Sequence, residues 1–286
     1  MISVIIPTRS RYHNLVNTLE ALFNQSLDKS QYEVIVSDDN STDETQSVIN
    51  RFKDRGRFKY VFNTFKPHSW NASVPRNLGA LVADPDTKAY LFVDSDVILP
   101  HHALEVYVED LNKNSSRVII GPYNFMDRNG VDVKIIDVRT PKFSSVSIDE
   151  TFDTVHDGLA CFGGNIVIPR DIFWSVNGFS VDTHIGLEDG DMGLKLWKKG
   201  TSFSYENRNM GTHQWHESPP DRFPNNMKEH IDNLNLKHYG TKDPDYGIIE
   251  ASRETYASWG ITGWNPPQEW LKMGFGLQIN TINTDK

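Results

Sequence analysis

The chain has 286 residues, of which 38% are hydrophobic, so it is long and apolar enough to form a large packed core. Its 29 basic and 38 acidic residues give a formal net charge of −9, and no block of Lys and Arg stands out. This balance argues against nucleic acid as the main partner, because phosphate contacts need a basic surface, although a single nucleotide needs only a few local groups.

Cysteine content and hydropathy indicate the compartment. Cys161 is the single cysteine, which excludes an intrachain disulfide and fits a reducing, cytoplasmic location. The sequence has no run of about 18 apolar residues, so it predicts no membrane-spanning helix. Met1–Pro7 is too short and too lightly charged for a signal peptide. Peripheral association with a membrane remains open.

Short apolar runs and amphipathic segments alternate along the first 121 residues. The apolar runs predict buried strands at Ser3–Pro7, Glu33–Ser37, Phe58–Phe62, Tyr90–Val93 and Arg117–Gly121. The predicted helices lie at Asn14–Asn24, after an expected capping box at Ser41–Glu44, at Arg76–Leu81 and around Leu104–Leu111. This alternation is typical of an α/β protein with a mostly parallel central sheet flanked by helices.

Three of the predicted strands run into Thr8, Asp39 and Asp94. If the strands are parallel, these residues meet at the carboxyl edge of the sheet, where open α/β sheets bind their ligands. Ser95 separates Asp94 from Asp96, and an extended backbone places both carboxylates on the same side. Such a pair is favourable when a cation lies between the acids, and Mg²⁺ or Mn²⁺ suits carboxylate ligands. The plain alternative is a pair of solvated acids in a turn.

The pattern changes after Pro122. Val131–Ile135 alternates with period two, which favours a half-exposed antiparallel strand. Further strands are predicted at Gly163–Pro169 and Phe203–Tyr205, helices at Arg170–Val176, from Leu187 onward and at Asn226–Tyr239, and loops at 139–157 and 206–225. We therefore predict three parts, namely 1–121, a smaller and partly antiparallel part at 122–225, and a C-terminal helical extension at 226–286.

Four sequence patterns occur in a fixed order. They are Ser3-Val-Ile-Ile-Pro-Thr8, Val34-Ile-Val-Ser-Asp-Asp-Asn-Ser-Thr-Asp43, Pro75-Arg-Asn-Leu-Gly-Ala80 and Phe92-Val-Asp-Ser-Asp96. Together they resemble the nucleotide-sugar-dependent glycosyltransferases of the GT-A (Rossmann-like) fold, and among these the large inverting family 2. A later stretch, from Phe162-Gly-Gly-Asn165 to Gly186-Leu-Glu-Asp-Gly-Asp-Met-Gly-Leu-Lys-Leu196, is similar to the acceptor-side segment of galactosyl- and N-acetylgalactosaminyltransferases.

The resemblance implies that residues 1–121 bind a UDP-sugar donor and that 122–225 form the acceptor and catalytic half. Asp39 would accept a hydrogen bond from the imide N–H of uracil, a donor that suits a carboxylate. Thr8 and Arg9 would border the base. Arg76 would approach the base or the diphosphate, which fits a guanidinium fork, although a surface salt bridge is the alternative. The remaining donor contacts would come from Asp94, Ser95 and Gly164.

A metal site is the second implication of the resemblance. Asp96 matches the principal metal-binding carboxylate of the family. His213, in Met210-Gly-Thr-His213, matches a histidine that supplies a further ligand in similar galactosyltransferases, and His216 is the competing choice. A histidine ligand favours Mn²⁺ over Mg²⁺. A loop histidine without a role is the plain alternative.

Glu188 and Asp189 resemble the acidic pair at the acceptor site of the family. An inverting transfer needs a carboxylate that takes the proton from the attacking hydroxyl, and Asp189 matches that base. Glu188 would orient the acceptor hydroxyls, and the helix dipole at the start of a helix would keep Asp189 ionised, although both acids could instead only cap that helix. Asp191 is expected to cap the helix. The candidate rings for stacking on a sugar are Trp70 and Trp215.

The sequence therefore predicts a metal-dependent transferase that moves a hexosyl or N-acetylhexosaminyl group from a UDP-sugar to a hydroxyl of a glycan or other acceptor, with inversion. A retaining GT-A transferase similar to N-acetylgalactosaminyltransferases is the first alternative. A non-catalytic carbohydrate-binding relative is the second. A nucleotidyltransferase is disfavoured, because Pro7–Arg11 lacks the glycines of a triphosphate-binding loop.

Overall fold

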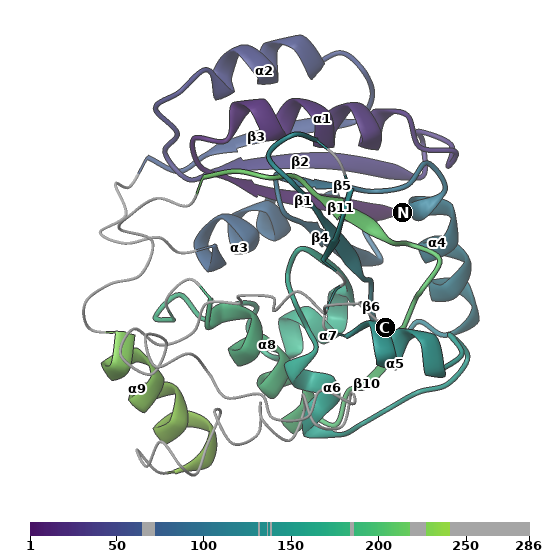
Figure 1. Ribbon diagram of the computed structural model, residues 1–286, viewed down its shortest axis with the longest axis vertical. Coiled ribbons are helices and arrows are strands. Elements are labelled where there is room, and N and C mark those ends of the chain that lie inside the picture. The colour runs from purple at the N-terminus through teal and green to yellow at the C-terminus, as the bar shows by residue number, and fades with distance from the viewer. Residues whose placement is uncertain are drawn as a thin grey trace, which may run out of the picture.

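The computed structural model describes residues 1–64, 72–130, 132–135, 137, 139–183, 186–217 and 227–240. These residues form a large seven-stranded sheet with helices on both faces and a smaller four-stranded sheet beside it (Figure 1). The candidate sugar-stacking residue Trp70 and the residues after 240 lie outside the described residues.

The large sheet has the strand order β10-β6-β9-β4-β1-β2-β3. In that order its strands are Ser202–Tyr205, Arg117–Ile120, Asn165–Pro169, Ala89–Val93, Ile2–Thr8, Tyr32–Asp38 and Phe58–Phe62. Neighbouring strands are parallel except where β9 pairs with β4 and with β6. The predicted α/β fold with a mostly parallel central sheet is confirmed, and each predicted strand of this sheet lies within one or two residues of its observed position.

The carboxyl ends of β1, β2 and β4 meet at one edge of the large sheet. Thr8 pairs with Asp38 in the parallel register of β1 and β2, and β4 ends at Val93 on the other side of β1. Because β9 runs in the opposite direction, its first residue, Asn165, pairs with Val93. The residues that precede β9, among them Gly164, therefore lie at this same edge.

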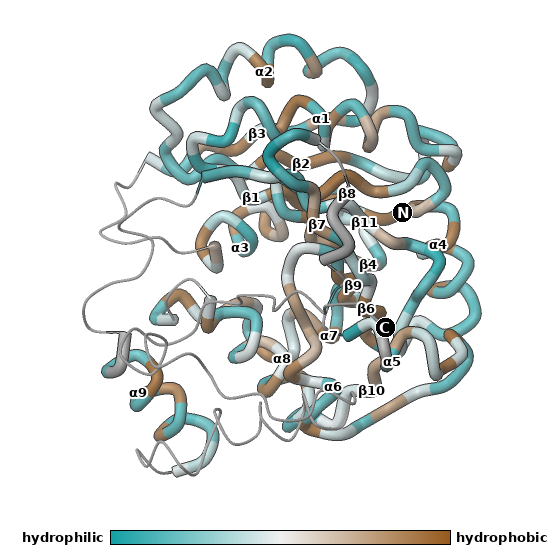
Figure 2. The backbone as a smooth tube through the Cα atoms, in the orientation of Figure 1, coloured by the Kyte–Doolittle hydropathy of each residue, from teal (hydrophilic) through white to brown (hydrophobic). Residues whose placement is uncertain are grey.

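Helices cover both faces of the large sheet (Figure 1). On one face lie α1 (Tyr12–Phe23), α2 (Thr45–Phe52) and α4 (Ala103–Lys113), and on the other α3 (Ser73–Val82), α7 (Arg170–Ser175) and α8 (Glu188–Lys198). Val4 and Ile6 of β1 face the first core, and Ile5 faces the second. Burial on both sides explains the unbroken apolar runs of these strands, which Figure 2 shows in brown. In the described part of the chain, no helix has the length and apolar character needed to cross a membrane.

The smaller sheet begins directly after β4 and has the order β5-β11-β7-β8. Its strands are Val97–Ile98, Gly211–His213, Tyr123–Met126 and Asp132–Ile135. β8 is antiparallel to β7, which confirms the strand predicted from the period-two pattern. The prediction of a loop throughout 206–225 is wrong at 211–213, because β11 pairs with β5 and β7. A strand of three residues is too short to show a period in the sequence.

The predicted capping box at Ser41–Glu44 is wrong. α2 begins at Thr45, and its N-cap residue, Glu44, makes no side-chain capping bond. Asp43 instead accepts hydrogen bonds from the backbone N–H of Tyr12 at 3.1 Å and of Thr45 at 3.1 Å. Its carboxylate therefore ties the start of α1 to the start of α2.

The segment 139–157, predicted to be a loop, contains the short helix α5 (Thr140–Ser145) and the start of α6 (Val155–Leu159). A capping box does open α6. Thr154 Oγ1 accepts a hydrogen bond from the backbone N–H of Asp157, and the Asp157 carboxylate accepts one from the backbone N–H of Thr154 at 3.0 Å. The polar residues of this segment therefore cap a helix or face solvent, and they do not indicate a continuous loop.

The predicted C-terminal helix is confirmed as α9 (Met227–Tyr239), which packs against α8. Asp191, in the first turn of α8, is fully buried and lies 2.7 Å from Lys237 Nζ and 2.8 Å from His238 Nε2. Burial alone would raise the pKa of Asp191, but the hydrogen bonds from α9 lower it to about 2. The expectation that Asp191 caps its own helix is therefore corrected: this carboxylate anchors α9.

Candidate active site

Asp39 lies at the carboxyl edge of the sheet, between the ends of β1 and β2. It is buried, and its Oδ1 accepts a hydrogen bond from Asn63 Nδ2 at 2.8 Å. Arg9 Nη1 is 3.6 Å from Asp39 Oδ2. The backbone N–H of Asp39 donates to the carbonyl of Thr8 at 2.8 Å. Burial raises the pKa of Asp39, and the contacts with Asn63 and Arg9 oppose that rise. The structure thus brings together three predicted donor residues and adds Asn63, which no sequence motif marks.

The neighbouring acid, Asp38, has a different role. Its Oδ2 accepts a hydrogen bond from the Tyr60 hydroxyl at 2.8 Å, and its Oδ1 accepts one from the backbone N–H of Ser41 at 2.8 Å. Both oxygens of Asp38 therefore stabilise the end of β2 and the turn after it. This leaves Asp39 as the member of the pair that is suited to bind a ligand.

A second cluster is centred on Arg76 of α3, whose side chain is only 2% exposed. Its Nη2 lies 2.9 Å from Asp94, and its Nη1 lies 3.0 Å from Asp189 and 3.3 Å from Glu188. Burial opposes a charge on the guanidinium, but the three carboxylates outweigh burial and raise its pKa. One arginine therefore connects the end of β4 to the first turn of α8. Its predicted contact with the donor remains a prediction.

Gly163 is the residue that leaves room for this cluster. A Cβ atom at this position would lie 2.5 Å from Arg76 Nη2 and 2.5 Å from Asp189 Oδ1, closer than real Cβ contacts allow. The absence of a side chain at Gly163 therefore has a steric function. It lets the backbone pass directly beside the Arg76 ion pairs.

The buried position of Glu188 predicts a pH-dependent stability. Burial and the adjacent Asp189 raise its pKa to about 7 from 4.5, although Arg76 opposes this. Between these two pH values the folded protein binds a proton that the unfolded chain has lost, so the free energy of unfolding falls as the pH rises through this window. In the Glu188→Gln variant, we expect the free energy of unfolding to decrease less over this pH window than in the wild type, by up to about 3 kcal/mol. Urea unfolding at several pH values measures this difference. Identical pH dependence in both proteins would contradict the assignment.

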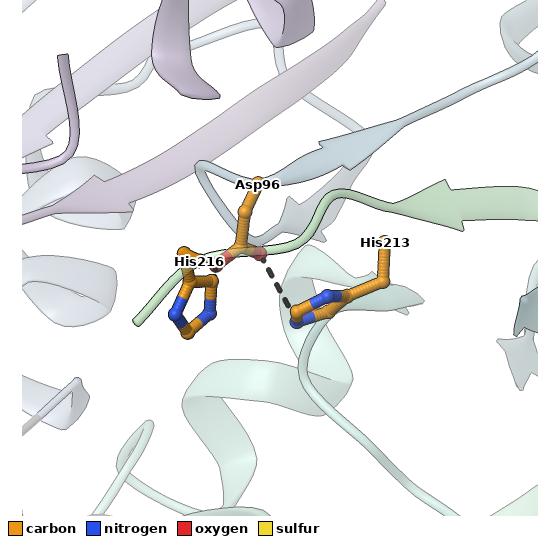
Figure 3. A group of neighbouring side chains, drawn as sticks. All are labelled: Asp96, His213 and His216. Atoms are coloured by element: carbon orange, nitrogen blue, oxygen red, sulfur yellow. Dashed lines mark ion pairs between the residues drawn. The ribbon is translucent and has the colours of Figure 1, made fainter. Parts of the chain in front are cut away.

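The third cluster consists of Asp96, His213 and His216, whose side chains point toward one another (Figure 3). His216 Nε2 is 3.1 Å from Asp96 Oδ2, and His213 Nε2 is 3.5 Å from Asp96 Oδ1. One ligand atom from each residue lies within 4.8 Å of the others. On sequence grounds, His216 is the alternative to His213 as a metal ligand. The structure brings both histidines to the same carboxylate.

The environment of Asp96 favours a positively charged neighbour. It is 8% exposed, and its Oδ1 has no hydrogen-bond donor among the residues that the structure describes. Burial would raise its pKa, but His213, His216 and Arg11 lower it to about 2. A buried carboxylate oxygen without a donor, facing two imidazole nitrogens, fits a divalent transition metal such as Mn²⁺.

The two sheets position this cluster. Asp96 directly precedes β5, and His213 is the last residue of β11, which pairs with Val97 of β5. The His213 ring packs against the ring of Phe125 in β7, with centroids 5.0 Å apart. Backbone pairing and ring packing therefore fix the orientation of His213 toward Asp96.

The other predicted residues lie around these clusters. Ser95 is buried between Asp94 and Asp96, and a Cβ on Gly164 would approach Asp94 Oδ2 to 3.2 Å. Trp215 is 41% exposed, with the guanidinium of Arg128 5.1 Å from its ring centroid. The contacts of Ser95, Gly164 and Trp215 with a sugar remain predictions.

Comparison with known proteins gives the family. The sequence model described as glycosyl transferase family 2 matches residues 3–176, which is more than half of the chain. The chain belongs to glycosyl transferase family 2. It is 27% identical to the validoxylamine A glucosyltransferase of Streptomyces hygroscopicus subsp. jinggangensis, over 91% of this chain and 68% of that protein. The family predicted from the four sequence patterns is confirmed, and the protein is a glycosyltransferase.

Solved structures agree on the fold. TarS of S. aureus, solved in complex with UDP-GlcNAc, matches with a TM-score of 0.66 at 17% identity over 90% of this chain and 71% of that chain. GalNAc-T7, solved with UDP, GalNAc and Mn²⁺, matches with a TM-score of 0.62 at 14% identity over 90% of this chain and 54% of that chain. These likenesses confirm the GT-A fold. The closer resemblance of 162–196 to galactosyltransferases remains a prediction.

Proposed function

We propose that this protein transfers a sugar from a UDP-sugar to an acceptor hydroxyl, with inversion at the anomeric carbon and with a divalent metal, Mn²⁺ or Mg²⁺. The convergence of Asp96, His213 and His216 beside the acids held by Arg76 carries this proposal. The likeness to TarS, whose structure contains UDP-GlcNAc, supports a uridine nucleotide.

The donor would bind across the carboxyl edge of the sheet. Asp39 would accept the imide N–H of uracil, with Thr8 and Arg9 at the border of the base. Asn63 donates to one oxygen of Asp39, and the second oxygen, 3.6 Å from Arg9 Nη1, would accept the imide N–H. The end of β4 lies on the other side of β1, so a bound nucleotide would extend from β2 toward Asp94.

Asp96, His213 and His216 would hold the metal. One carboxylate and two imidazoles suit Mn²⁺, and the GalNAc-T7 structure with Mn²⁺ supports a metal in a protein of this fold. When bound, the ion supplies electrostatic stabilisation of the departing diphosphate.

Asp189 would act as the general base. Its side chain is 25% exposed, so a hydroxyl can reach it, and the ion pair with Arg76 fixes the position of the carboxylate. It would accept the proton of the attacking hydroxyl while Glu188, buried beside it, orients the acceptor. Attack from the side opposite the leaving diphosphate gives inversion.

The metal site is tested by Asp96→Asn. We expect UDP to bind at least about 10-fold more weakly in the presence of Mn²⁺, because a metal loses its one anionic ligand. Isothermal titration of UDP, first with Mn²⁺ and then with EDTA, measures this. Asp110→Asn is the matched control, since Asp110 is a fully buried acid that pairs with Arg208 at 3.0 Å.

Wild-type titrations with Mn²⁺ and with EDTA separate the parts of the proposal. Equal UDP affinity in both conditions would contradict the metal. Absence of UDP binding in both conditions would contradict the uridine nucleotide, and GDP and dTDP would be titrated next.

A further inference from the structure

We propose that Gln214 and Thr18 are positioning residues that hold the two segments of the Asp96–His213–His216 site in register. This inference rests on the proposed metal site. Gln214 lies between the two histidines in sequence and is only 4% exposed. Its backbone N–H donates to the carbonyl of Asp96 at 2.7 Å.

The side chain of Gln214 is attached to α1 by every polar group it has. Its Oε1 accepts a hydrogen bond from Asn17 Nδ2 at 2.7 Å. Its Nε2 lies 3.1 Å from the carbonyl of Asn14 and 3.3 Å from Thr18 Oγ1, and it can donate to both. A primary amide offers the acceptor and the two donors that this position requires.

Thr18 connects the same helix to the other segment. Its side chain is fully buried, and its Oγ1 donates to the carbonyl of Ser95 at 3.0 Å while it accepts from Gln214. Ser95 directly precedes Asp96. One hydroxyl on α1 therefore bridges the segment that carries the carboxylate and the segment that carries both histidines.

This bridge is needed because the ligand residues are far apart in sequence. β11 fixes His213, but His216 lies three residues beyond the end of that strand. The attachment of 214–217 to α1 continues with Asn14 Nδ2 donating to the Trp215 carbonyl at 3.3 Å and Arg11 Nη1 donating to the Glu217 carbonyl at 3.0 Å. Groups that orient metal ligands typically change metal affinity 10- to 100-fold when they are removed.

The expected result is a loss of Mn²⁺ affinity without loss of the fold. Gln214→Met keeps the length of the side chain and removes the hydrogen bonds of its amide group, and we expect Mn²⁺ to bind at least about 10-fold more weakly. Thr18→Val, which is nearly isosteric, should show the same direction of change. Thr18→Ser, which retains the hydroxyl, should restore the affinity toward the wild-type value.

Gln25→Met is the matched control. Gln25 is 8% exposed near the other end of α1, and its Nε2 donates to the carbonyls of Ala21 at 3.1 Å and Pro100 at 2.9 Å. Its Oε1 accepts from the backbone N–H of Leu104 at 3.0 Å. This variant loses a similar set of buried hydrogen bonds, so its melting temperature should fall comparably while its Mn²⁺ affinity stays unchanged.

The measurement is the concentration of free Mn²⁺, which its electron paramagnetic resonance signal reports during titration into the wild-type chain and each variant, with melting curves in parallel. Wild-type binding together with unchanged affinity in Gln214→Met and Thr18→Val would overturn this inference alone. An equal loss of affinity in Gln25→Met would assign the effect to general destabilisation and also overturn it. Failure of the wild-type protein to bind Mn²⁺ would overturn the proposed metal site, and this inference with it.

Discussion

Asp189→Asn is expected to lower the rate of sugar transfer by about 10²- to 10⁴-fold while UDP affinity stays at its wild-type value. The amide has nearly the same shape as the carboxylate and can still accept a hydrogen bond from Arg76 Nη1, which lies 3.0 Å from Asp189 Oδ1. It cannot take a proton from an attacking hydroxyl. The loss therefore falls on the chemical step and not on donor binding, and transfer kinetics combined with UDP titration separate the two.

Asp171→Asn is the control for this experiment, because Asp171 is an exposed acid in the first turn of α7, another helix of the same face. Its transfer rate should equal that of the wild type. Full activity in Asp189→Asn would refute Asp189 as the base. The anomeric configuration of the product tests inversion independently, since a retained configuration would exclude direct attack by an acceptor that Asp189 deprotonates.

Arg76→Leu is expected to reduce the free energy of unfolding by about 3–5 kcal/mol, the usual cost of removing one partner from a buried ion pair. The substitution leaves Asp94, Glu188 and Asp189 close together without a counter-charge. Asp94 and Asp189 are partly exposed and keep some hydration, whereas Glu188, whose side chain is only 4% exposed, must take up a proton to remain buried. Urea unfolding at neutral pH measures the change.

Two further variants serve as comparisons for Arg76→Leu. Arg51→Leu removes an arginine that is 58% exposed and pairs with Glu20 at 2.6 Å, so it should change stability by less than about 1 kcal/mol. Arg76→Lys keeps the charge but loses the fork that reaches three acids, and its stability should lie between those of the wild type and Arg76→Leu. A loss in Arg76→Leu no larger than that in Arg51→Leu would show that the cluster does not depend on its cation.

Most of the large sheet could be predicted from the sequence, because its strands are buried on both faces. Tyr90–Val93 is fully buried, and such segments appear as uninterrupted apolar runs. The errors fall on elements that depend on tertiary contacts. β11 pairs with β5 and β7 over three residues, and the start of α2 is held by Asp43, which also contacts α1, in place of the predicted capping box. Neither arrangement leaves a periodic signal in the sequence.

In the candidate site, too, some features could be predicted from the sequence and others depend on tertiary contacts. Asp39 and Asp96 were predictable because each follows a strand that ends at the carboxyl edge of the sheet. The pairing of both histidines with one carboxylate was not predictable, because it depends on how the segment after β11 attaches to α1. The carboxylates around Arg76 come from two distant segments, the end of β4 and the first turn of α8, so their convergence on Arg76 could not be inferred from sequence spacing.

The reversed direction of β9 has an evolutionary consequence. The chain leaves β6 after Ile120 and returns at Asn165, and the backbone N–H of Gly121 donates to the carbonyl of Asn165 at 2.9 Å. The segment between β7 and β9 is therefore an excursion that departs from and returns to one edge of the sheet. Within this excursion, Arg139 and Phe143 are buried, whereas the turn at 128–130 between β7 and β8 is exposed. Insertions and deletions at that turn would leave the register of the large sheet unchanged, so the turn can vary in length while the clusters around Asp39 and Asp96 keep their geometry.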